Sequence, residues 1–317
     1  MEINMKILKN IAQTCGVIAV TCLLLYGAVL LTRPKTVDYE VATIEAFHKM
    51  PDFSLDVIAY GSSHMWQGIK PTQLKEQYGI EAYNYADAWQ RLNTTTLFVE
   101  DSLITQKPKV AIIDTHKFNQ VLRDMDMDGE IYYTRFLKET PSRKRFLKDC
   151  FGGELERYLS YIFPFISFHQ NWAEVDEKTF SQTPEDLVPE FIELRGFRQK
   201  IRPQAIDLNY DPNVEQSELS EDSIKELDYI MSLFENSGTK VIFITVPYEG
   251  VDTFHDSIAE YAALHDIPYL NLFEYIDEIG LDGETDFVDE GHLNDSGATK
   301  VTEFMGEYLK ENYPEVL

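Results

Sequence analysis

The sequence of 317 residues predicts an α/β fold, in which a mostly parallel sheet is covered by helices, preceded by one transmembrane helix. Three observations predict this fold. Short apolar segments of strand type alternate with segments of helical periodicity. The chain is 44% hydrophobic and 13% aromatic, which is enough for a substantial core. An uncharged segment of 22 residues, Ile11–Thr32, stands near the N-terminus.

The apolar segment Ile11–Thr32 would reach about 33 Å as a helix, and the hydrocarbon core of a bilayer is about 30 Å thick. We expect an uncleaved signal anchor. A cleaved signal peptide is the alternative, because Lys6 and Lys9 precede the segment, but no small-x-small cleavage site follows it. A buried core helix is the third possibility. Arg33 and Lys35 balance the two preceding lysines, so charge does not decide the orientation.

The organisation of the chain follows from these patterns. We expect a short tail over 1–10, the membrane helix over 11–32, a juxtamembrane linker or helix over 33–50 and one α/β domain over 51–317. From about 123 to 220 the alternation of strand and helix patterns breaks down, which indicates a helical insertion over one rim of the sheet.

The first half of the domain reads as strand, helix, strand, helix, strand. The apolar run Asp56–Tyr60 predicts the first strand and Pro71–Tyr78 the first helix, while Ile80–Tyr85 predicts a second, short strand. A helix over about Thr94–Thr105 then leads to the third strand, Val110–Asp114, which Lys107-Pro108 introduces.

The second half continues the alternation, beginning with a helix. Apolar residues at helical spacing predict a helix over Glu221–Ser237, and Lys240–Val246 reads as the fourth strand. A helix around Asp256–His265 leads to the short strand Pro268–Leu272, and a closing helix is expected over about Ser296–Glu311. Such alternation is typical of a doubly wound, mostly parallel sheet.

Candidate catalytic residues stand at two turns. Gly61-Ser62-Ser63-His64 follows the first strand directly, and ligands of open α/β sheets bind at the carboxyl ends of the strands. A serine hydroxyl becomes a nucleophile when an imidazole takes its proton and a carboxylate orients that imidazole. Ser63, His292 and Asp289 fit these roles. Alternatively, the serines merely cap the following helix.

The pair Asp289 and His292 has two other interpretations. The two side chains could form a surface ion pair, or they could bind a metal together with Asp286 and Glu290. No second histidine has ligand spacing to His292, so we expect neither a metal nor another cofactor.

The charge of the chain excludes one class of partner. A net charge of −26 argues against nucleic acid, whose phosphates are held mainly by Lys and Arg. One basic stretch, Arg135–Lys148, precedes the aromatic segment Tyr158–Phe168. It could face lipid headgroups, an anionic polymer or a membrane partner, but a solvated helix face is the interpretation we favour.

The two catalytic turns resemble the first and last blocks of the SGNH, or GDSL-type, hydrolase superfamily. Gly61-Ser62-Ser63 stands where the superfamily has Gly-Asp-Ser, and Asp289-Glu-Gly-His292 matches its Asp-x-x-His block. Gly-Ser-Ser behind a membrane helix is similar to the membrane-anchored DltD-like branch, which accompanies membrane-bound O-acyltransferases. Phe163–Trp172 and Arg195–Phe197 also look like that branch. The resemblance implies a flavodoxin-like three-layer sandwich.

The resemblance also implies an activity. It suggests an extracytoplasmic serine O-acyltransferase or esterase in a bacterial cell membrane, acting on acyl groups of an envelope polysaccharide or teichoic acid. Ser63 would be the nucleophile, His292 the base and Asp289 its orienter. Two alternatives remain: a largely non-catalytic docking partner of a membrane-bound O-acyltransferase, and a simple carbohydrate acetylesterase.

The oxyanion hole departs from the superfamily pattern. The backbone N–H of Ser63 is one expected donor, and Ala86 or Asp87 stands nearest to the glycine of the second block. The asparagine of the third block has no direct counterpart. Three residues after the third strand offer a donor in its place: Thr115, His116 and Asn119.

Four further residues are candidates for the substrate pocket. His64 adjoins Ser63, so it is better placed to line the pocket than to act as the base. Gln90 belongs to the polar turn after the second strand. His169 and Trp172 would line an acceptor groove, although an aromatic core contact explains them equally well.

Overall fold

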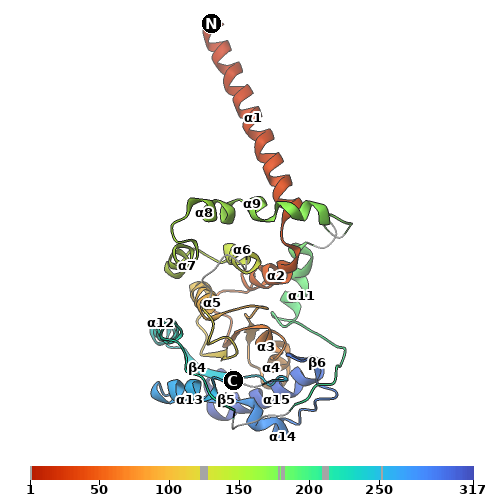
Figure 1. Ribbon diagram of the computed structural model, residues 1–317, viewed down its shortest axis with the longest axis vertical. Coiled ribbons are helices and arrows are strands. Elements are labelled where there is room, and N and C mark those ends of the chain that lie inside the picture. The colour runs from red at the N-terminus through yellow and green to blue at the C-terminus, as the bar shows by residue number, and fades with distance from the viewer. Residues whose placement is uncertain (1, 122–127, 178, 180–182, 209–213, 251–252) are drawn as a thin grey trace.

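The protein contains one five-stranded parallel sheet with helices on both faces (Figure 1). The computed structural model describes all residues except 1, 122–127, 178, 180–182, 209–213 and 251–252. The strand order is β2-β1-β3-β4-β5, which is the order of flavodoxin-like sheets. The strands are β1 (Val57–Tyr60), β2 (Ala82–Asn84), β3 (Val110–Asp114), β4 (Lys240–Thr245) and β5 (Tyr269–Asn271).

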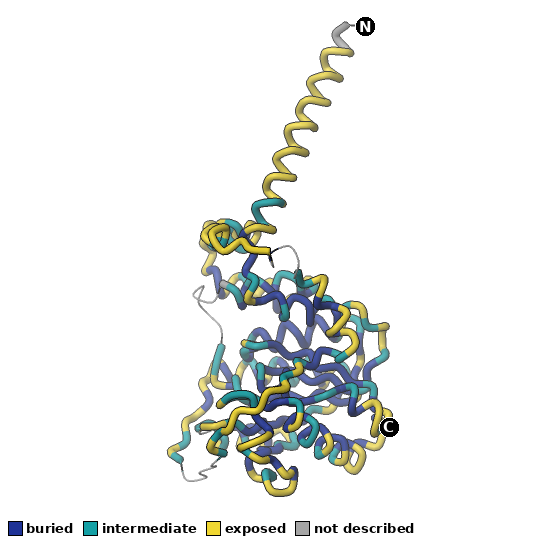
Figure 2. Tube along the Cα trace, turned by 90° about the vertical axis from the view of Figure 1, so that its right-hand side faces the viewer, coloured by how far each residue is buried: buried dark blue, intermediate teal, exposed yellow. Residues whose placement is uncertain are grey.

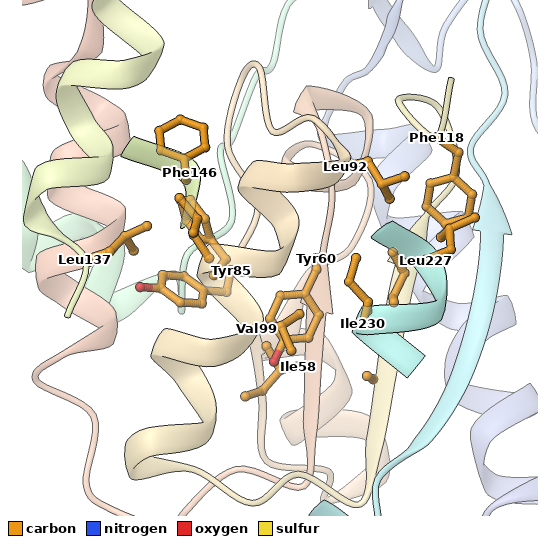
Figure 3. Packing of buried hydrophobic residues seen from close by; sticks show 14 of the residues in the cluster. Ile58, Tyr60, Tyr85, Leu92, Val99, Phe118, Leu137, Phe146, Leu227 and Ile230 are labelled. Carbon is orange, nitrogen blue, oxygen red and sulfur yellow. The ribbon is translucent and has the colours of Figure 1, made fainter. Parts of the chain in front are cut away.

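The strands are buried on both faces, which explains their nearly continuous apolar sequences. Side chains of β1 alternate between two cores: Ile58 and Tyr60 enter one, and Val57 and Ala59 enter the other. Figure 3 shows the first core, in which Val99 of the flanking helix lies beside the β1 side chains. The prediction of an α/β fold with a mostly parallel sheet is confirmed.

Helices cover each core. The first core takes side chains from α5 (Leu92–Thr105), α12 (Glu221–Ser237) and α13 (His255–Leu264). The second takes them from α3 (Ser63–Trp66), α4 (Pro71–Tyr78) and α15 (Asp295–Asn312). Five of these six helices lie within two residues of the predicted bounds at both ends; the sixth, the single turn α3, was not predicted as a helix.

The predicted membrane helix is α1 (Glu2–Thr32), which projects from the domain (Figure 1). Its segment Met5–Thr32 has a mean hydropathy of 2.3 in its most apolar window, and that window is not buried by the rest of the chain. Figure 2 shows its exposed surface along nearly the whole length. α1 is therefore long and apolar enough to span a membrane.

The segment after α1, for which we predicted a linker or a juxtamembrane helix, is helical. It forms the short helix η1 (Lys35–Val37) and then α2 (Asp38–Phe47). Val41, Ile44 and Phe47 of α2 enter the first core, while its two alanines enter the second. Packing of α2 against α11 (Pro184–Glu193) completes this wall of the domain. Residues 33–50 therefore belong to the folded domain.

The predicted insertion is helical in the part that the structure describes, although its expected start, residues 123–127, lies outside that part. Its helices lie between the sheet and α1 (Figure 1), and Ile131, Tyr133, Leu137 and Phe146 join the first core. The helices are α6 (Asp128–Tyr133), η3 (Thr134–Phe136), α7 (Pro141–Phe151), α8 (Leu155–Ile162), α9 (Phe165–Phe168), η4 (His169–Glu174) and α11.

The chain closes with small elements before and after α15. A two-stranded antiparallel hairpin stands where we predicted a plain turn. These elements are η5 (Leu272–Tyr275), α14 (Ile276–Ile279), the hairpin strands β6 (Phe287–Asp289) and β7 (His292–Leu293), and η6 (Pro314–Val316).

Candidate active site

The turn between β1 and α3 is fixed by a glycine. Gly61 has φ +145°, and a Cβ there would lie 2.4 Å from the Cβ of Asp114 at the end of β3. Only glycine fits this close approach. Gln90 holds the turn from the other side, because its Oε1 accepts the Gly61 N–H at 2.8 Å. Ser63 therefore begins α3 at the carboxyl edge of the sheet, between β1 and β3, where the strand order reverses.

The two neighbouring serines have different surroundings. Ser62 is fully buried, and its hydroxyl donates to Asp114 Oδ2 at 2.8 Å. It also caps α3 by accepting the His64 N–H at 3.4 Å. Burial raises the pKa of Asp114 to about 6. Ser62 is therefore a structural residue, whereas Ser63 faces the cavity described below.

Ser63, His292 and Asp289 form a continuous hydrogen-bonded chain. The Ser63 Oγ lies 2.7 Å from His292 Nε2, and His292 Nδ1 lies 2.7 Å from Asp289 Oδ1. The carboxylate accepts from Nδ1–H, which leaves Nε2 free to take the serine proton. Gly291 N–H also donates to Asp289 Oδ1, at 2.9 Å. The geometry is that of a nucleophile, base and orienting carboxylate.

The β6–β7 hairpin holds the histidine and the carboxylate because α15 is capped beneath it. Asn294 accepts from the N–H groups of Ser296 and Gly297, and its amide donates to Thr285 O and Phe287 O in the hairpin. One residue thus joins the helix start to the catalytic hairpin.

Asp286 takes part in this support. Its carboxylate is fully buried and lies 2.6 Å from Lys300 Nζ and 2.7 Å from Ser296 Oγ. Burial acts to raise the pKa of Asp286, but its hydrogen bonds and the Lys300 charge outweigh it and leave that pKa lowered. Among the residues described, no group of three or more His, Cys, Asp or Glu is arranged to hold a metal ion.

Two further histidines lie beside the hydrogen-bonded residues Ser63, His292 and Asp289. The His64 and His116 rings stack with centroids 3.7 Å apart, and Tyr248 meets both rings edge-on at 5.1 Å. Burial, followed by the nearby Lys117 and His292, lowers the pKa of His116 to about 3; burial likewise lowers the pKa of His64 well below its usual value. Both rings are therefore neutral near pH 7 and do not compete with His292 for the proton.

The turn after β2 brings Ala88, and not Ala86, to the cavity over Ser63. Ala86 is buried and does not line the cavity, because the strand pairing continues past β2: the Asp87 N–H donates to Gly61 O at 3.2 Å. The Trp89 N–H donates to Asp87 Oδ1 at 2.8 Å. Ala88 lines the cavity, and its N–H has no acceptor among the described residues. The predicted Ala86 thus lies outside the cavity, and Ala88 lines it.

Of the three third-block candidates, His116 alone lines the cavity with Ser63. The Thr115 hydroxyl lies 2.6 Å from that of Thr245, on the next strand. Asn119 is exposed and lines a separate cavity of about 140 Å³. The Ser63 N–H, like that of Ala88, has no acceptor in the described part of the chain, so both are available to an oxyanion.

The cavity over Ser63 has a volume of about 370 Å³ and is lined in part by residues that the sequence did not suggest. Tyr39 and Glu40 reach it from α2, and burial raises the pKa of Glu40 to about 7. Three cationic side chains line it as well: Lys117, Arg198 and Lys200. The helical spacing of apolar residues in α2 was visible in the sequence. No sequence motif, however, marked the loop that carries Arg198 and Lys200 as part of a site.

Three of the four predicted pocket residues lie elsewhere. His64 lines the cavity, but Gln90 is buried behind Gly61. His169 and Trp172 are exposed in η4, near the end of α1. η4 packs against α1, and neither side chain lines the cavity over Ser63.

No protein-family model matches the chain, and no curated protein matches it significantly. Among solved structures, a "putative acylhydrolase" from Bacteroides fragilis is similar at 10% identity and a TM-score of 0.40. The match covers 84% of this chain and 93% of that one. Activity is therefore argued from the geometry of the site.

Proposed function

We propose that the protein is a serine-dependent O-acyl esterase or acyltransferase of the SGNH type. The observation that carries this proposal is the Ser63–His292–Asp289 chain, in which both hydrogen bonds measure 2.7 Å. A purely docking domain has no need of a serine bonded to an oriented imidazole. The geometry therefore supports catalysis over docking.

The reaction proceeds in two halves. The Ser63 Oγ attacks the acyl carbonyl while its proton passes to His292 Nε2, and the bond to the leaving alcohol breaks as His292 returns that proton to it. An acyl group is then esterified to Ser63. An acceptor hydroxyl or water, deprotonated by His292, attacks this ester and frees the serine. Asp289 stabilises the imidazolium at each stage.

The oxyanion forms next to three donors. The N–H groups of Ser63 and Ala88 line the cavity, and the neutral His116 ring supplies a third N–H in one tautomer. Each such donor is worth about 3–4 kcal/mol in the transition state when it is well aligned. His116 thus takes the place of the asparagine in the superfamily's third block.

The substrate we propose is an acylated polymer of the bacterial cell envelope, such as a polysaccharide or a teichoic acid. The cavity is open and carries Lys117, Arg198 and Lys200, which suit an anionic polymer. α1 would anchor the protein in the cell membrane with the domain outside the cytoplasm. A membrane-bound O-acyltransferase is the partner that the DltD-like sequence motifs suggest.

An active-site serine probe tests the proposal. The full chain, purified in detergent, is treated with a fluorophosphonate. We expect labelling of the wild type and of Ser62→Ala, and none of Ser63→Ala. Equal labelling of wild type and Ser63→Ala would contradict a catalytic serine at this position. After incubation with p-nitrophenyl acetate and an added polyol acceptor, the acetylated polyol then reports transfer and free acetate reports hydrolysis.

A further inference from the structure

The segment α8–η4, residues 155–174, forms an apolar surface across the domain-side end of α1 (Figure 1). We call it the platform. Figure 2 shows it as a mostly exposed layer between α1 and the rest of the domain. Its large exposed apolar side chains are Leu155, Tyr158, Leu159, Ile162, Phe163, Ile166 and Trp172. This number of large exposed apolar side chains on one short segment is unusual for a surface that faces water.

The exposed side chains of α8 share one face of the helix. Leu155, Tyr158, Leu159 and Ile162 stand at i, i+3, i+4 and i+7, and they are 69%, 46%, 36% and 37% exposed. The opposite face packs on α7, where the Tyr161 ring lies 5.5 Å from that of Phe151. The domain thus holds α8 with its apolar face outward.

The platform is fixed to the end of the predicted membrane span. Asn171 Nδ2 donates to Thr32 O, the last residue of α1, at 3.3 Å. Lys35 Nζ donates to Glu174 O at 2.8 Å. When α1 spans a bilayer, its end at Thr32 lies at the membrane surface, and these bonds place the platform at the same level.

Two arginines of the basic stretch that precedes the platform are engaged within the protein. Arg143 is buried and donates to Leu137 O at 2.9 Å, and Arg145 pairs with Glu226 at 2.8 Å. Arg143 thus holds the insertion together, and Arg145 joins it to α12. The large exposed side chains of the platform are apolar and aromatic, and we expect these to contact the membrane.

We propose that the platform lies in the interfacial layer of the bilayer that α1 spans, with the apolar face of α8 and Trp172 among the headgroups and upper acyl chains. The inference rests on the proposed membrane anchorage of α1 and not on the proposed reaction. An amphipathic helix with aromatic side chains on its apolar face is suited to this layer. Trp and Tyr are also the residues that favour the membrane–water interface.

Site-directed spin labelling of the full chain in phosphatidylcholine and phosphatidylglycerol vesicles tests the proposal. Cys15→Ser and Cys22→Ser remove the accessible thiols, since Cys150 is only 1% exposed. Leu155→Cys, Leu159→Cys and Ile162→Cys are then labelled one at a time. Leu264→Cys is the matched control, because Leu264 is 75% exposed on α13, far from α1 (Figure 1). The native Cys22, labelled in a Cys15→Ser chain, reports on α1.

We expect the α8 labels to be more accessible to oxygen than to a water-soluble nickel complex, and the Leu264→Cys label to show the reverse. If the α8 labels behave like Leu264→Cys while Cys22 lies in the bilayer, the platform faces water or a protein partner and the proposal is wrong. If the label at Cys22 is also accessible to the nickel complex, α1 does not span the bilayer and the proposal is wrong. Labelling by the fluorophosphonate reports separately on the proposed reaction.

Discussion

The hydroxyls of Ser62 and Ser63 are adjacent in the chain but have different tasks. Ser62 points inward to Asp114, and Ser63 points to His292. The motif comparison selected the correct serine to face the imidazole. It did not select among Thr115, His116 and Asn119, because the rotation of the turn after β3 decides which of them reaches the cavity.

Asp289 should be required for turnover and not for folding. It is half-exposed, and its main contacts are to His292 and Gly291. Asp289→Asn removes the carboxylate that fixes the imidazole tautomer, so we expect kcat for ester hydrolysis to fall by roughly 10³-fold or more. Glu290→Gln, at the exposed neighbouring position, is the matched control and should retain full activity. Equal activity of Asp289→Asn and Glu290→Gln would exclude the orienting role.

His116 should make stability depend on pH. Its pKa is about 3 in the folded protein and about 6.5 when unfolded, so only the unfolded chain gains the proton between these values. Its contribution to stability is complete above pH 6.5 and declines as pH falls towards 3, by up to about 1.4 kcal/mol per pH unit.

His116→Phe keeps a ring against His64 and removes this titration. We therefore expect the free energy of unfolding of the wild type to fall more than that of the variant when the pH is lowered from 7 to 5. Urea unfolding at the two values measures it. An unchanged difference would mean that the His116 ring takes up its proton in the folded state.

Among the elements, those with continuous apolar runs were the most predictable. All five strands and the long helices of the sheet layers follow from such runs, because burial on both faces or along one stripe dictates them. For the segment of α2 the sequence left a linker and a juxtamembrane helix open, although Val41, Ile44 and Phe47 stand at helical spacing. Its burial depends on packing against α11, some 140 residues later, and no local pattern shows that partner.

The turn between β1 and α3 should tolerate no side chain at Gly61. Gly61→Ala brings a Cβ within 2.4 Å of the Asp114 Cβ, at a φ of +145°. We expect a loss of about 3 kcal/mol or more in stability and no reaction with the serine probe. Gly79→Ala is the control: it also has a positive φ, of 75°, but no atom lies within 4 Å of its added Cβ.

A loss of about 1–2 kcal/mol is expected for Gly79→Ala, with the probe reaction retained. Thermal unfolding followed by circular dichroism compares the two variants. Similar stability for both would show that the turn can widen without cost.

At the scale of the whole molecule, the boundary of the folded unit lies before α2 and not after it. A chain beginning at Arg33 keeps α2, whereas one beginning at Pro51 loses it and leaves both cores open. Val41, Ile44 and Phe47 each contribute about 1.5–3 kcal/mol by burial, so their sum approaches the net stability of a typical domain.

We therefore expect a cooperative thermal transition and serine labelling for the chain from Arg33, and neither for the chain from Pro51. Both chains are produced without α1 and compared in the same detergent, which shields the platform. Cooperative unfolding of the shorter chain would mean that α2 is dispensable.

The short path from α1 to the catalytic cavity has a consequence for how the protein meets its substrate. Only Arg33–Val37 separate α1 from α2, and Tyr39 and Glu40 of α2 line the cavity over Ser63. A domain on a long flexible stalk would sweep through a broad volume, whereas the proposed anchorage holds this one at a single height above the lipid. With the proposed polymer substrate, an acyltransferase would then add acyl groups, and an esterase would remove them, in a band at a constant distance from the membrane.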